Sequence, residues 1–139
     1  TFLYLAFHGG YHQYFLLFWL RDFSEALQKW DLDHRLILEN ARKIGIERLL
    51  GVSLVLAKKF FNIEIPQTYR SFLDEESCII GKLSKFCNER IVGGKELNLY
   101  RKLRRFQYYL RLRPGIKYRW FVVIGVVHHY YIRKFLGGQ

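Results

Sequence analysis

Residues 46–61 read IERLLGVSLVLAKKFF, a run in which apolar side chains occupy most of the helical circumference rather than one stripe. A helix on the surface of a protein carries its apolar residues on one face, whereas a helix that is apolar almost all round is buried. Pro66 follows closely, and proline both restricts the residue before it and interrupts helical hydrogen bonding. We therefore expect a buried helix over 46–61, followed by a loop over 62–66.

The segments on either side also have a helical period. Upstream, the pattern predicts one long helix from about residue 2 to residue 29, and then a helix with Asp31 or Asp33 as its N-cap and Gly45 as its stop. Downstream, the expected helices cover residues 67–91, 95–112 and 116–136, with stops at Gly93-Gly94 and Pro114-Gly115. The sequence therefore predicts an all-α fold, a bundle of five or six helices in a single domain over residues 1–139.

Composition excludes several classes of protein. Of 139 residues, 50% are hydrophobic and 18% aromatic, too apolar for a disordered basic tail. Cys78 and Cys87 are nine residues apart, on opposite sides of a helix, which indicates reduced thiols. The apolar stretch 1–20 is interrupted by polar residues and glycines, and 120–132 is too short to cross a bilayer. We therefore expect a soluble, cytoplasmic protein.

The net charge of +11 is concentrated in the second half of the chain. Residues 71–139 carry fourteen basic and five acidic side chains, against nine and seven in residues 1–70. Basic and aromatic residues alternate over 100–119, a pattern that suits single-stranded nucleic acid, an anionic membrane surface, a nucleoside triphosphate, an acidic partner, or a merely solvated face. The candidate anion-binding residues are Lys102, Arg104, Arg105, Arg111, Arg113, Lys117 and Arg119.

A second candidate site lies in the expected first helix. Five residues repeat at the spacing of one helical face, with a glycine pair between the first two: His8, His12, Phe15, Trp19 and Asp22. Two adjacent glycines in a helix indicate close approach of another backbone or of a ligand. The face fits metal ligation, ligand or substrate contact, or a structural role at the edge of the core. Because no third ligand and no metalloprotease glutamate accompany the histidines, we assign no metal site.

The same residues carry a family resemblance. The run LYLAFHGGYHQYFLLFWLRDFSEAL and the later ARKIGIERLLGVSLVLAKKFFNIEIP resemble the C-terminal helical region of the bacterial uncharacterised nucleotidyltransferase family, relatives of the polymerase-β-like nucleotidyltransferases. The resemblance covers residues 1–73, and the basic end, 95–136, is similar only in its Arg-rich character. The matching positions are His8, Gly9, His12, Trp19, Asp22, Ala41, Arg42, Gly45 and Pro66.

The resemblance implies a parent protein that uses Mg²⁺ and a nucleoside triphosphate. Such chemistry needs closely spaced carboxylates after a Gly-rich turn, because two metal ions clamp the attacking and leaving oxygens. This chain lacks that motif: Asp31-Leu32-Asp33 has the spacing but sits at a helix junction and fits a cap. The chain also contains no methionine. We therefore expect a fragment that lacks an upstream catalytic domain, is not catalytic alone, and offers substrate contacts through His8, His12, Trp19 and Asp22.

The alternative function comes from the basic end of the chain. In that reading the protein is a free-standing basic helical adaptor that binds nucleic acid or another anionic partner through residues 100–119. It would then need neither an upstream domain nor a cofactor.

Overall fold

The computed structural model describes residues 1–14, 16–93, 99–113, 115, 118, 120 and 122–125. Over these residues every element is helical and none is a strand, so the all-α prediction is confirmed. The elements are α1 (Phe2–Tyr11), α2 (Leu17–Lys29), α3 (His34–Ile44), α4 (Glu47–Phe61), a 3₁₀ turn η1 (Gln67–Tyr69), α5 (Arg70–Glu75), α6 (Ser77–Gly93) and α7 (Leu99–Leu112).

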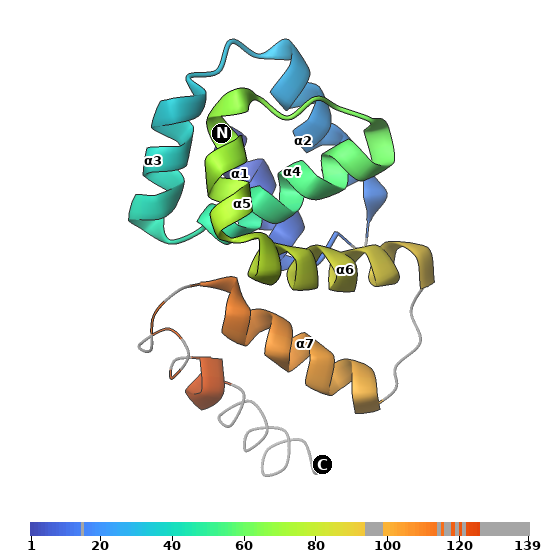
Figure 1. Cartoon of the computed structure of the whole chain (residues 1–139). Coiled ribbons are helices and arrows are strands. Elements are labelled where there is room, and N and C mark those ends of the chain that lie inside the picture. The colour runs from blue at the N-terminus through green and yellow to red at the C-terminus, as the bar shows by residue number, and fades with distance from the viewer. Residues whose placement is uncertain are drawn as a thin grey trace.

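Helix α4 is the centre of the bundle, as its composition predicts. It packs against α1, α2, α3 and α6, which surround it in Figure 1. The buried residues of α4 are not confined to one face and cover most of the helical circumference. They are Arg48, Leu49, Leu50, Gly51, Val52, Ser53, Leu54, Leu56 and Ala57.

The helix boundaries around α4 follow the capping signals in the sequence. The Asp33 side chain accepts a hydrogen bond from the backbone N–H of Leu36 at 3.0 Å, which makes it the N-cap of α3. Gly45 ends α3 in the left-handed region, with φ of 69°. Asn62 ends α4 in the same conformation, so the expected loop before Pro66 is also present.

The expected single helix over residues 2–29 is wrong. Helix α1 ends at Tyr11 and α2 begins at Leu17, because Gln13 and Tyr14 adopt φ angles of 60° and 48°. Non-glycine residues rarely occupy this left-handed region, and neither glutamine nor tyrosine is a residue type that predicts such a turn from the sequence. The break turns α2 back along α1, and the two helices pack against each other.

Burial of Tyr14 compensates for this unusual backbone. Its side chain is fully buried, and its hydroxyl lies 2.5 Å from the Ser53 Oγ of α4. Ser53 already donates its own proton to the Leu49 carbonyl, so Tyr14 is the donor to Ser53. A Cβ at Gly9 would lie within 3.0 Å of the Tyr14 ring. The glycine pair therefore makes room for a side chain of the protein itself.

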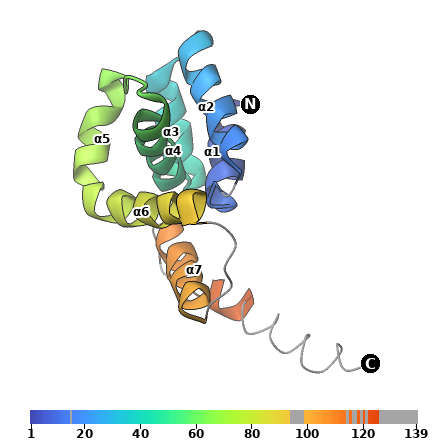
Figure 2. The same ribbon diagram turned by 90° about the vertical axis from the view of Figure 1, so that its right-hand side faces the viewer.

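The segment 67–91 is helical as expected, but it is not one continuous helix. It divides into η1, α5 and α6, with a turn at Glu76 from which α6 crosses beneath the bundle of α1 to α4 in Figures 1 and 2. The two unexpected divisions raise the number of helical elements in the described part to eight, rather than five or six. The side chains that these elements bury in the core include Phe72, Ile80, Leu83 and Phe86.

Helix α7 packs on the far side of α6 from the bundle (Figure 2). Long-range hydrogen bonds hold it there, among them one that the Tyr109 hydroxyl donates to the Tyr11 carbonyl at 3.2 Å. The Tyr108 hydroxyl donates to the Gly10 carbonyl at 2.5 Å, and the Arg48 guanidinium donates to the Arg111 carbonyl at 3.1 Å. These bonds join residues far apart in the chain, so they position α7 independently of the connection that leads into it.

The expected sixth helix, 116–136, lies largely outside the described residues, as does Pro114; the described residues 118, 120 and 122–125 are helical. In the part of the chain that the structure describes, no helix combines the length and the apolar character needed to span a bilayer.

Candidate functional site

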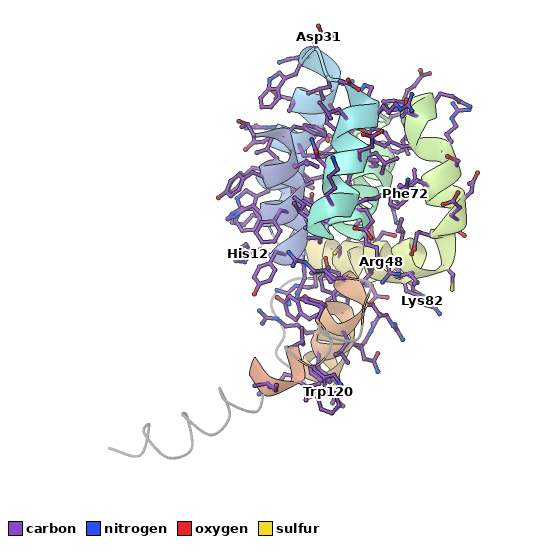
Figure 3. The ribbon with its side chains drawn as sticks, turned by 90° about the vertical axis from the view of Figure 1, so that its left-hand side faces the viewer. His12, Asp31, Arg48, Phe72, Lys82 and Trp120 are labelled. Carbon is purple, nitrogen blue, oxygen red and sulfur yellow. The ribbon has the colours of Figure 1, made fainter. Side chains whose placement is uncertain are left out.

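Three of the four residues expected to contact substrate lie together. The ring centroids of His8 and His12 are 4.8 Å apart, and the Trp19 ring lies 4.8 Å from His8 and 5.4 Å from His12. Helix α1 and its C-cap supply the histidines, whereas α2 supplies the tryptophan after the unexpected turn. His12, labelled in Figure 3, follows the last residue of α1.

Exposed tyrosines border these three rings on both sides. Tyr4 stacks on His8 with ring centroids 5.5 Å apart, and Tyr11 contacts His12 at the same separation. Both tyrosines are exposed. We call these five residues the aromatic–histidine cluster: Tyr4, His8, Tyr11, His12 and Trp19. It is an accessible surface of rings, of the kind on which a planar ligand can stack.

The electrostatic environment of the cluster disfavours a charged His12. Partial burial lowers the pKa of His12, and the neighbouring His8 and the Arg105 guanidinium of α7 lower it further. Since like charges oppose protonation, His12 stays neutral to a lower pH than a histidine without these neighbours. Neutral imidazole both donates and accepts hydrogen bonds, so His12 can pair with either kind of group on a ligand.

The expected histidine face contains two further residues, Asp22 and Phe15. Asp22 is exposed on α2, and its carboxylate lies 3.8 Å from the guanidinium of Arg21. Phe15 lies outside the described residues. The expectation assumed one uninterrupted helix, whereas α1 ends at Tyr11 and α2 begins at Leu17.

The candidate anion-binding residues lie on different surfaces of the molecule. Arg105 lies over the Tyr109 ring near His12, and Arg113 lies over the Tyr118 ring. Arg104 pairs with the Glu89 carboxylate of α6, and Lys102 is exposed. Lys117 and Arg119 lie outside the described residues. The described members therefore do not form one continuous face.

A groove between α6 and α7 gathers two of these arginines with two lysines that sequence reasoning missed. Its volume is about 260 Å³, and we call it the α6–α7 groove. Lys82 and Lys85 were missed because the basic run was sought in one segment, whereas the groove combines two. The lining residues are Lys82, Leu83, Lys85, Phe86, Arg104, Gln107, Tyr108 and Arg111.

Other chemical groups of the chain carry structural roles. Burial raises the pKa of the Cys87 thiol to about 12, so it is not a nucleophile at neutral pH. Asp33 is occupied as a helix cap, as the sequence predicts. Within the described ranges, no group of three or more His, Cys, Asp and Glu side chains is arranged to hold a metal ion.

Comparison with protein-family models, with curated proteins and with solved structures gave no match to this chain.

Proposed function

We propose that the chain is the helical, substrate-side region of a nucleotidyltransferase-like protein and is not catalytic alone. The observation that carries the proposal is the aromatic–histidine cluster, in which His8, His12 and Trp19 come together from two helices. These three residues are also among the positions that carry the family resemblance. A motif whose members gather on an accessible surface fits ligand contact better than a role inside the core.

The chemistry of the cluster fits a nucleotide. Exposed rings stack on planar bases, and a neutral histidine offers both a donor and an acceptor to a base or a sugar. In this proposal Asp22 takes no direct part, because it pairs with Arg21 on the exposed side of α2. The cluster then binds and orients, and the bond-making groups belong to another part of the parent protein.

The Mg²⁺ of the parent family does not fit the residues described here. The pair with the Asp-x-Asp spacing contains Asp33, whose carboxylate accepts the Leu36 N–H and is committed to capping α3. We therefore derive no step through a metal in this chain. The proposed partner is an upstream nucleotidyltransferase domain or chain that supplies the carboxylates. A reducing, cytoplasmic location is part of the proposal, because Cys78 and Cys87 are both free thiols.

The reading frame upstream of Thr1 tests this proposal. We expect it to encode a Gly-Ser turn followed by an Asp-x-Asp pair on a strand, because the transfer chemistry needs two carboxylates that hold metal ions. Sequencing the gene is sufficient. A start codon immediately before Thr1, or an upstream region without that pattern, would contradict the proposal.

A further inference from the structure

The α6–α7 groove differs from the rest of the surface in its charge. Four cations line it, two from each helix, and none of its lining residues is acidic: Lys82, Lys85, Arg104 and Arg111. In Figure 3, Lys82 and His12 lie on opposite sides of the molecule, so this groove is separate from the aromatic–histidine cluster. We propose that the α6–α7 groove binds the phosphate backbone of a single-stranded nucleic acid. This inference goes beyond the proposed function and does not depend on it.

Among the described residues, carboxylates neutralise only part of the positive charge of the groove. Arg104 pairs with Glu89 and lies over the Phe86 ring. For Lys82, Lys85 and Arg111, no carboxylate of the described residues lies within ion-pair distance. Three cations are therefore left to attract an external anion, and a concave site between two helices concentrates their field.

The spacing of the cations fits several linked phosphates better than it fits a single phosphate group. Arg104 and Arg111 are seven residues apart on α7, which corresponds to about 10 Å along the helix axis. A nucleic acid strand in a duplex carries one phosphate per about 3.4 Å of axis, so this length covers more than one phosphate. The Arg48 guanidinium holds the Arg111 carbonyl, which fixes one end of the row.

The floor of the groove indicates how the strand is recognised. Phe86 is 6% exposed and Tyr108 is 2% exposed, so their rings are covered by helix packing and are not open for base stacking. Contacts are then made by cations to phosphates, and not by rings to bases. Such binding depends little on base sequence and strongly on salt, because each phosphate contact releases a counterion.

Fluorescence anisotropy with a labelled oligothymidylate of about 12 nucleotides tests the proposal. With three or four phosphate contacts, we expect the Kd to rise about 20- to 50-fold between about 50 and about 200 mM NaCl. Lys82→Ala/Lys85→Ala removes two contacts, so it should weaken binding and reduce the logarithmic salt slope by about 1.4. Both lysines are exposed, so the variant is expected to fold.

Lys58→Ala/Lys59→Ala is the matched control. It removes the same charge from two exposed lysines in the last turn of α4, and Lys58 lines a different hollow. We expect it to leave the salt slope unchanged. The proposal is overturned if the wild type does not bind at about 50 mM NaCl, or if both double variants lose affinity equally. It is also overturned if a duplex, a nucleoside triphosphate or a phosphatidylserine vesicle competes better than the single strand at equal phosphate concentration.

Discussion

Gly9→Ala is expected to destabilise the protein by about 1–3 kcal/mol, the cost typical of overpacking a core. The local rule predicts the opposite sign, because alanine in the interior of a helix is favoured over glycine by about 1 kcal/mol. Packing decides the sign here: the new Cβ would lie within 3.0 Å of three atoms of the Tyr14 ring. That ring is fully buried and its hydroxyl is hydrogen-bonded to Ser53, so the ring cannot move aside without disturbing α4.

Gly81→Ala provides the matched comparison. Gly81 is also inside a helix, α6, but a Cβ there would meet no atom of another group within 4 Å. We expect this variant to gain stability, by up to about 1 kcal/mol. Urea unfolding of the two variants and the wild type measures both changes. Stabilisation by both substitutions would contradict the packing of Tyr14 over Gly9.

Glu76→Ala is expected to cost about 3 kcal/mol, because it leaves a buried guanidinium without its partner. Arg48 lies in α4 with its side chain 8% exposed, and its Nε and Nη2 atoms lie 3.0 and 3.4 Å from the two Glu76 carboxylate oxygens. The Glu76 side chain is 30% exposed, so this carboxylate retains part of its hydration. Loss of the acidic partner is therefore worse than loss of the basic one.

Arg48→Met separates the charge from the packing of the side chain. Methionine keeps an apolar stem and leaves two groups without their partner, the Glu76 carboxylate, which water reaches, and the Arg111 carbonyl. Neither is a buried charge, so we expect a smaller loss of about 1–2 kcal/mol. Combining the two substitutions should recover part of the stability that Glu76→Ala loses, since no buried charge remains. Chemical denaturation of the three variants gives the order. If Arg48→Met is the more damaging single change, the inference that burial of the guanidinium dominates is wrong.

The central part of the fold could be predicted from sequence because its signals are local. The apolar circumference of 46–61, the cap at Asp33 and the glycine stop at Gly45 each act over a few residues, and each expected element is present. The turn at Gln13 and Tyr14 could not be predicted in this way. Its stability comes from a hydrogen bond to Ser53, 39 residues along the chain, and from burial of a ring against α1.

The same contrast between local signals and long-range contacts applies to the residues of the candidate sites. His8 and His12 were found because four residues separate neighbours on a helical face, and Trp19 joins them although α1 and α2 are separate helices. Asp22 was expected on the same reasoning, and the structure shows it exposed on α2 with its carboxylate beside Arg21. Lys82 and Lys85 had no local signal, because only the crossing of α6 and α7 brings them beside Arg104 and Arg111.

The central claim is that the aromatic–histidine cluster contacts a nucleotide. It is tested most directly by following histidine ring resonances by NMR while a nucleoside triphosphate with Mg²⁺ is added to the protein as its gene encodes it. We expect the resonances of His8 and His12 to shift. His34, whose Nδ1 lies 3.1 Å from the Tyr69 hydroxyl between α3 and η1, is the internal control and should stay unchanged. Absence of nucleotide binding, or saturation that leaves both cluster histidines unmoved, would contradict the account.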